Sequence, residues 1–173
     1  MDQPTPRDHP AALGDDALLA QCDQKFLRRS GPGGQNRNKV ETAVVLHHRP
    51  SGLGAEANER RSQSENRVEA LRRLRIDLAI TVRRPVNPLE PPSPLWRSRL
   101  KGGRIALSPT HEDVPAILAE ALDVWADREG DVKAASDILG CSATQLIKLF
   151  KLEPKVFTAV NRDRASRGLR PLL

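Results

Sequence analysis

The sequence is poor in aromatic residues and cysteine, and it has no long apolar run. Aromatic residues make up 3% of its 173 residues, and tyrosine is absent. Cys22 and Cys141 are far apart and belong to no Cys-x-x-Cys or Cys/His cluster, so neither a disulfide framework nor a metal site is supported. The first 20 residues contain four aspartates, which is unlike a signal or transit peptide, and no segment approaches a membrane span. We therefore expect a cytoplasmic protein with no metal, no cofactor and no membrane partner.

Positive charge is unevenly distributed along the chain. The segment from Lys25 to Arg104 holds 18 Lys/Arg against 7 Asp/Glu, a net of +11, whereas His111 to Leu173 holds 9 against 10, a net of −1. A basic front part favours an anionic partner such as RNA. A merely well-solvated surface is the alternative interpretation.

The patterns predict an α+β protein in four parts. Residues 1–14 carry three prolines and are expected to be disordered. Residues 15–84 are expected to form a small β-sheet with a packed helix: a short helix capped by Asp15 or Asp16, strands over 24–29, 42–48 and 53–58, and a long helix from Ser62 to about Val82. That helix is predicted to bury one apolar face, formed by Val68, Leu71, Leu74, Leu78 and Val82.

The second half is predicted to be a linker followed by helices. Residues 85–109 include five prolines within ten residues, a density that argues against regular structure and for a semi-rigid linker. Residues 110–173 are predicted to form an all-α helical bundle, with caps at Thr110, Asp131 and Ser142. Gly140 and Ser142 give the bundle a helix-turn-helix character, which is typical of small DNA-binding domains but is equally met in bundles used for packing or docking.

A Gly-Gly-Gln tripeptide at residues 33–35 is the most specific feature of the chain. Adjacent glycines permit positive φ and a close approach of another backbone, and Gln35 offers a main-chain N–H and an uncharged amide. No catalytic triad, metal set or carboxylate pair accompanies the tip, and His47 and His48, as successive strand residues, point to opposite faces.

Three motifs in order extend this signal: Ser-Gly-x-Gly-Gly-Gln at 30–35, Asn-Lys-Val-Glu-Thr at 38–42 and Arg-Ser-Gln-x-x-Asn-Arg at 61–67. In order and spacing, residues 17–84 resemble the catalytic domain of class I peptide-chain release factors and of the stand-alone ribosome-rescue hydrolases related to them. The resemblance implies hydrolysis of the peptidyl-tRNA ester inside the ribosomal peptidyl-transferase centre. The ribosome and the tRNA would supply most reacting groups there.

The resemblance also assigns roles to residues. Gly33, Gly34 and Gln35 are the expected catalytic residues, with the Gln35 N–H donating to developing negative charge and its side chain placing water. Contacts to RNA or the ribosome are expected from Arg28, Arg29, Ser30, Asn36, Arg37, Asn38, Lys39, Arg61, Gln63, Arg67, Arg72, Arg73, Arg99, Lys101 and Arg104. Arg37 departs from relatives, which commonly carry a small apolar residue there. For the arginines of the long helix, simple solvation is an equally good interpretation.

The expected function is codon-independent release of nascent peptide from stalled ribosomes by a monomer whose partners are ribosomal RNA and peptidyl-tRNA. No segment is long enough for a stop-codon-reading domain, and the C-terminal bundle replaces the basic tail of known rescue hydrolases. Two alternatives remain at this point. One is a non-catalytic RNA- or ribosome-binding adaptor, and the other is a nucleic-acid-binding regulator acting through the helix-turn-helix, which the near-neutral charge of that region disfavours.

Overall fold

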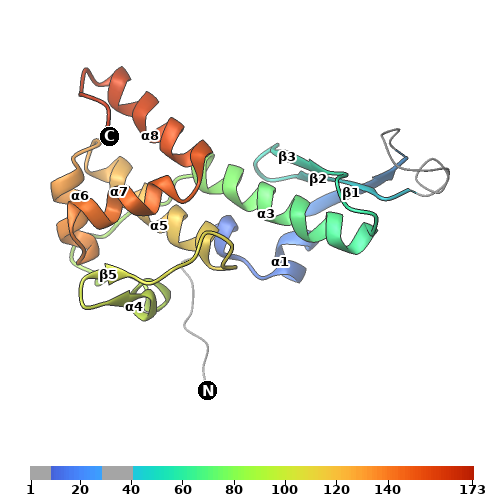
Figure 1. Cartoon of the computed structure of the whole chain (residues 1–173), viewed down its shortest axis with the longest axis horizontal. Helices are drawn as coiled ribbons and strands as arrows, with labels where there is room; N and C mark the ends of the chain where they lie inside the picture. Colours follow the sequence, from blue (N-terminus) through green and yellow to red (C-terminus); the bar gives the residue numbers. More distant parts are fainter. Residues whose placement is uncertain (1–8, 29–40) are drawn as a thin grey trace. The chain divides into compact units, whose positions relative to one another are not determined.

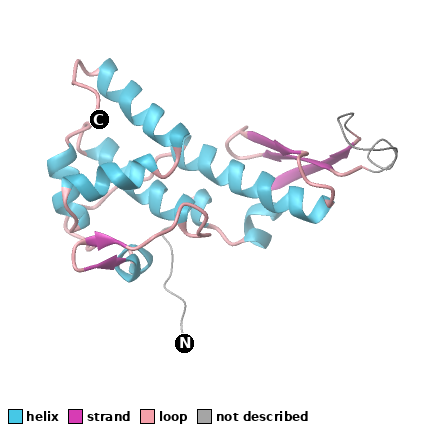
Figure 2. Cartoon of the chain, viewed as in Figure 1, coloured by secondary structure: helices cyan, strands magenta, loops and turns pink. Residues whose placement is uncertain are grey.

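The computed structural model describes residues 9–28 and 41–173, and these form two compact units (Figure 1). The first, here called the sheet unit, comprises residues 13–78. The second, the helical unit, comprises residues 79–173 together with 9–12. The boundary falls within one long helix, α3 (Gln63–Thr81). The α+β class predicted from the sequence is confirmed (Figure 2).

The sheet unit is built on one antiparallel sheet in the order β1-β2-β3. Its elements are α1 (Asp15–Ala20), β1 (Cys22–Leu27), β2 (Ala43–His48), β3 (Gly54–Ala57) and α3 (Gln63–Thr81). The strands lie within two residues of the ranges predicted from alternation and turn residues. In the register, Leu27 faces Ala43, so the β1–β2 ladder ends where residues 29–40 begin.

Two details of the helices in this unit differ from prediction. The N-cap of α1 is Gly14, without a side-chain cap, and Asp15 and Asp16 lie in the first turn instead, where carboxylates suit the positive end of the helix dipole. On α3, Val68 is 65% exposed although its spacing predicts the apolar face, whereas the leucines of that face are buried. The fully buried Asn66 occupies the corresponding place near the start of the helix.

The helical unit has an apolar core that contains both tryptophans. Its elements are η1 (Pro10–Ala12), α4 (Pro94–Arg99), β4 (Leu100–Lys101), β5 (Arg104–Ile105), α5 (Val114–Asp127), α6 (Val132–Leu139), α7 (Ala143–Lys151) and α8 (Pro154–Ser166). Trp125 and Phe150 meet edge to face with ring centroids 5.5 Å apart. Trp96, 1% exposed, donates from Nε1 to the carbonyl of Leu139 at 2.8 Å.

The proline-rich stretch is not simply a linker, because its second half is folded. Ser93 accepts a hydrogen bond from the Trp96 N–H and caps α4, whose first residue is Pro94. Proline suits that position because its missing N–H would have no partner in the first turn. The two-stranded hairpin β4–β5 follows within 85–109, whereas the regular elements of the predicted bundle at 110–173 are all helices. The expectation of irregular structure throughout 85–109 was therefore wrong.

The N-terminal segment also contradicts prediction where the structure describes it. His9 is 1% exposed, its Nε2 lies 3.2 Å from the carbonyl of Val82, and its Nδ1 accepts from the N–H of Ala11 at 3.0 Å. These bonds require a neutral ring protonated on Nε2. Burial lowers the pKa of His9, which keeps the ring neutral. Residues 9–12 are thus part of the helical unit rather than disordered.

Two of the three predicted caps in the bundle are confirmed. Asp131 accepts from two N–H groups at the start of α6, and Ser142 accepts from Gln145 N at the start of α7. Gly140 between them has φ 67°, a conformation that favours glycine. The cap predicted at Thr110 was wrong, because α5 begins at Val114. In the part of the chain that the structure describes, no helix combines the length and apolar character needed to span a membrane.

Candidate functional site

The Gly-Gly-Gln tripeptide lies outside the described residues, and the structure defines the two stems on either side of it. The incoming stem ends at Arg28 after β1, and the outgoing stem begins at Glu41 before β2. Arg28 Nε lies 3.7 Å from Glu41 Oε1, and both side chains are more than half exposed. An exposed ion pair contributes at most about 1 kcal/mol. It nevertheless joins the two ends of the loop.

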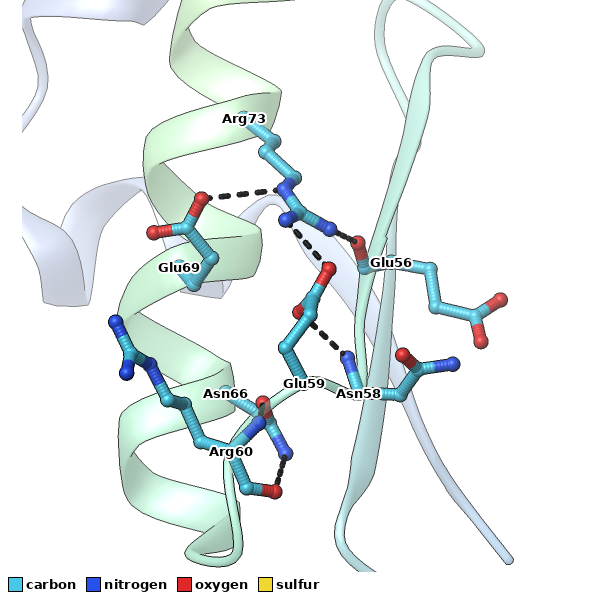
Figure 3. Close-up of polar contacts among 7 residues, drawn as sticks. All are labelled: Glu56, Asn58, Glu59, Arg60, Asn66, Glu69 and Arg73. Carbon is cyan, nitrogen blue, oxygen red and sulfur yellow. Dashed lines mark hydrogen bonds and ion pairs between the residues drawn. The ribbon is translucent and has the colours of Figure 1, made fainter. Parts of the chain in front are cut away.

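Two side chains at the start of α3 hold the outgoing stem. Gln63 Nε2 donates to the carbonyl of Glu41, and Asn66 Nδ2 donates to the carbonyl of Thr42, each at 2.8 Å. Asn66 also donates to the carbonyl of Arg60 and accepts from the Arg60 N–H, at 3.0 and 2.9 Å (Figure 3). Because Asn66 is fully buried, each of these bonds replaces one that water would otherwise make. The outgoing stem is thereby fixed to α3.

Further along α3, Arg73 ties the helix to the end of β3. Its guanidinium donates to the Glu56 carbonyl at 2.6 Å and pairs with Glu59 at 2.6 Å and with Glu69 at 3.2 Å (Figure 3). The hydrogen bond from Arg73 holds the pKa of Glu59 below its usual value. Two carboxylates thus offset the charge of Arg73. The structure gives this residue a supporting role that the sequence did not suggest.

The remaining predicted RNA-contacting residues divide between the two units. In the sheet unit, Arg61 and Arg67 are exposed and Arg72 is half-buried. In the helical unit, Lys101 and Arg104 are exposed on the hairpin, while Arg99 pairs with Asp113 at 2.5 Å. The other predicted site residues lie outside the described residues: Arg29, Ser30, Gly33, Gly34, Gln35, Asn36, Arg37, Asn38 and Lys39.

His48 has a structural role on β2. It is 2% exposed; its Nε2 donates to Gln21 Oε1 at 2.9 Å and its Nδ1 accepts from the Ser51 hydroxyl at 2.7 Å. Burial lowers the pKa of His48, so the ring is neutral in this arrangement. His47 is exposed on the opposite face, as the strand alternation predicts.

Sequence patterns pointed to no role for Asn66 or Glu59, although both side chains support the site. Asn66 stands within the Arg-Ser-Gln-x-x-Asn-Arg motif, and its place three residues after Gln63 is the signal that was available. Residues three and four apart lie on one face of a helix, so both side chains can reach the same strand end. Glu59 carries no comparable signal, because its partner is fourteen residues away.

One protein family matches this part of the chain. Residues 19–88 match the family described as the RF-1 domain. The match includes the whole sheet from β1 to β3, the loop between β1 and β2, and α3. Residues 89–173 lie outside it.

Curated relatives match a part of the chain of similar length. The chloroplastic peptide chain release factor PrfB1 of Arabidopsis thaliana is 44% identical over 69 residues, 40% of this chain and 15% of the relative. A mitochondrial peptide chain release factor-like protein of Saccharomyces cerevisiae, itself uncharacterised, is 46% identical over 63 residues, 36% of this chain and 41% of the relative. Peptide chain release factor 1 of Chlorobaculum tepidum is 53% identical over 52 residues, 30% of this chain and 15% of the relative.

The aligned part of this chain spans less than half the length of each of these relatives. Two of the three carry organelle designations, so the relatives do not single out the cytoplasm. The loop tripeptide, the stem contacts from Gln63 and Asn66, and the domain match all fall in one segment. Residues 19–88 are therefore similar to the RF-1 domain family, and the relatives that match this chain are peptide chain release factors or release factor-like proteins.

Proposed function

We propose that this protein hydrolyses the ester bond of peptidyl-tRNA in the ribosomal peptidyl-transferase centre, without reading a codon. The observation that carries the proposal is an intact Gly-Gly-Gln tripeptide in an RF-1 domain, whose outgoing stem is fixed by two hydrogen bonds from α3. A loop that must enter a crowded pocket gains from a fixed base, because misplacement of the reacting groups lowers the rate steeply.

In this proposal, water attacks the ester carbonyl carbon, the bond to the tRNA ribose oxygen breaks, and the peptide leaves with a free carboxyl end. The Gln35 N–H donates to the carbonyl oxygen as negative charge develops there. The Gln35 side chain positions the water, and the ribosome and tRNA carry the proton to the departing ribose hydroxyl. The protein therefore contributes positioning and one donor.

Cations and uncharged polar side chains around the loop would hold the domain against ribosomal RNA. We assign this role to Arg28, Arg29, Ser30, Asn36, Arg37, Asn38, Lys39, Arg61, Arg67 and Arg72. Gln63 and Arg73 were grouped with them on sequence grounds, and we now propose that both support the loop from within the protein, because their donors are engaged with Glu41, Glu56 and Glu59. Arg99, Lys101 and Arg104 belong to the helical unit, which we assign to docking rather than to codon reading.

The test is release of labelled peptide from ribosomes that carry a stop codon, a sense codon or no codon in the A-site. We expect similar release in all three cases and little hydrolysis of free peptidyl-tRNA, since the proposal assigns no general base to the protein. Release restricted to stop codons would overturn codon independence. Efficient hydrolysis of free peptidyl-tRNA would overturn the role of the ribosome.

A non-catalytic adaptor is the second candidate, and the helix-turn-helix of the helical unit favours it. The same assay separates the two functions. An adaptor binds ribosomes but gives no release at any protein concentration, whereas the proposed hydrolase gives release that increases with concentration until its sites are saturated.

A further inference from the structure

The helical unit has a basic surface that the proposed hydrolysis does not use. Strand β5 lies against α7, because the Ile105 N–H donates to Gln145 Oε1 at 3.3 Å. The hairpin β4–β5 and the exposed side of α7 are therefore neighbours within this unit. The exposed polar side chains define what we call the hairpin–helix surface: Lys101, Arg104, Thr144, Lys148 and Lys151.

Helix α7 carries its fully buried residues and its exposed residues on opposite sides. Its buried residues are Leu146, Leu149 and Phe150, spaced three and four apart. Its exposed residues are Thr144, Lys148 and Lys151, spaced four and three apart. With 3.6 residues per turn, the second set lies directly opposite the first. The polar side of α7 is thus available to a partner, and Lys151 also lies 5.4 Å from the centre of the Phe157 ring.

The cations of this surface have no acidic partner within the described part of the chain. Lys101 and Arg104 face each other directly across the hairpin. Like charges at opposite positions destabilise a strand pair. Neither these two residues nor Lys148 pairs with a carboxylate among residues 9–28 and 41–173, whereas Arg99 and Lys133 of the same unit do. The repulsion between Lys101 and Arg104 lowers the stability of the hairpin, and it indicates a binding partner whose negative charge would offset it.

The tip of the β4–β5 hairpin consists of two glycines, so another molecule can come close to its backbone. Gly102 and Gly103 have φ of 55° and 74°, as a two-residue hairpin turn requires. A Cβ added at either glycine would meet nothing within 4 Å, so the tip is open on its outer side. Both tip glycines are exposed residues, and main-chain N–H groups are regular phosphate ligands in nucleic-acid complexes.

We propose that the hairpin–helix surface binds the phosphate backbone of double-stranded RNA. Lysine is a point charge suited to phosphate, and α7 exposes no arginine to pair with a base edge in two places at once. Such a surface holds a duplex without reading its sequence. The choice of RNA over DNA rests on the proposed function, which places the protein on the ribosome. Binding through the backbone also suits RNA, because A-form duplexes are recognised mainly by shape and backbone contacts. The proposal that this surface binds phosphate does not depend on the proposed function.

The test uses the full chain and a 20-base-pair RNA duplex of arbitrary sequence, with binding followed by fluorescence anisotropy over a range of salt concentrations. The variant Lys101→Ala/Arg104→Ala should bind the duplex more weakly at every salt concentration. The slope of log affinity against log salt should fall by about 2, because two fewer phosphates are neutralised by the variant. Lys148→Ala alone should lower the slope by about 1.

The control is Lys133→Ala/Arg167→Ala, which removes the same charge from cations already paired with Asp137 and Asp163. It should leave the salt slope unchanged. Equal losses in the two double variants would mean that only net charge matters, and would overturn the proposal. Wild-type binding by the hairpin variant would overturn it as well, and tighter binding to a DNA duplex of the same sequence would overturn the choice of RNA. Because the duplex is separate from the ribosome, the test is informative even if the protein releases no peptide.

Discussion

Both units bury apolar side chains, but the contacts that fix the segments beside the loop in the sheet unit differ in kind from those that fill the core of the helical unit. In the sheet unit, the segments beside the loop are held by side chains that donate to main-chain carbonyls, as Asn66 and Arg73 do. In the helical unit, large apolar side chains such as Trp96 and Phe150 fill a core between helices. Hydrogen bonds are directional, whereas apolar burial is not. We therefore expect substitutions in the sheet unit to act mainly through the position of the loop, and substitutions in the helical unit to act mainly through the stability of its core.

If this comparison is correct, the largest single effect on activity comes from the loop and leaves both units folded. Replacing Gln35 with Ala should lower release by ~10²–10³-fold, through loss of the side chain that places water, an effect comparable to removing one donor from an oxyanion site. Gln24→Ala, which changes an exposed glutamine on β1, is the matched control and should release at the wild-type rate. Wild-type release by Gln35→Ala would exclude the catalytic assignment.

The helical unit should show the largest effect on stability. Trp96→Ala removes a fully buried indole and leaves the Leu139 carbonyl without its donor, so we expect a loss of about 3–5 kcal/mol in the free energy of unfolding of this unit. Hydrogen exchange followed by mass spectrometry reports each unit separately. Protection should fall in α4 to α8 and remain unchanged in β1 to β3. Leu89→Ala, at a residue 93% exposed, should change neither unit.

In the sheet unit, Asn66→Asp should affect stability and activity together. The change keeps the shape and the acceptor for the Arg60 N–H, but it removes both donor bonds and buries a negative charge near two carbonyls. Each buried group left without a partner costs about 1–3 kcal/mol. Release should fall as well, because the outgoing stem loses its tie to α3. Gln63→Glu, which removes one exposed bond, should have a smaller effect on both.

The measurement that isolates positioning is release at a temperature where the Asn66→Asp variant is still fully folded by circular dichroism. Reduced release under that condition would show that the stem contact positions the loop. Unchanged release would mean that Asn66 contributes to stability alone. The contacts of the sheet unit would then have no separate role in activity.

Local sequence patterns predicted the elements that depend on local chemistry. Strand alternation gave β1 to β3 within two residues, and Asp131, Gly140 and Ser142 marked the ends of α6 and the start of α7. The assignment failed where one rule was applied too broadly. Five prolines between 85 and 94 favoured a linker, but the last of them begins α4 behind its serine cap.

Long-range contacts explain the remaining differences. His9 is ordered by a bond to a carbonyl 73 residues away, and Arg73 joins a helix to a strand end seventeen residues earlier. No periodicity or cap rule carries such information. Spacing was the sole reason to place Val68 on the buried face of α3. In the structure Val68 is exposed, and the polar Asn66 is the residue buried near the start of the helix. The Arg-Ser-Gln-x-x-Asn-Arg motif includes Asn66, but the motif does not indicate which carbonyls its side chain binds.

The smallest predicted effect is a pH dependence that both units share through separate histidines. His48 in the sheet unit and His9 in the helical unit are neutral, each with its pKa lowered by burial. In the unfolded chain a histidine takes up a proton near its ordinary pKa of 6.5, while the folded protein resists protonation to lower pH. The unfolded state therefore binds more protons below that pH, and each unit should lose stability as the pH falls from about 7.5 to about 5.5.

Single variants assign this loss to a unit. His48→Gln should remove the pH dependence of hydrogen exchange in β1 to β3 over this range, and His9→Gln should do so in the helical unit. The lowered pKa of Glu59 acts below the ordinary carboxyl value of 4.5, so it does not contribute in this window. If His48→Gln altered the pH response of both units equally, the two units would unfold together, and the boundary within α3 would not separate independent stabilities.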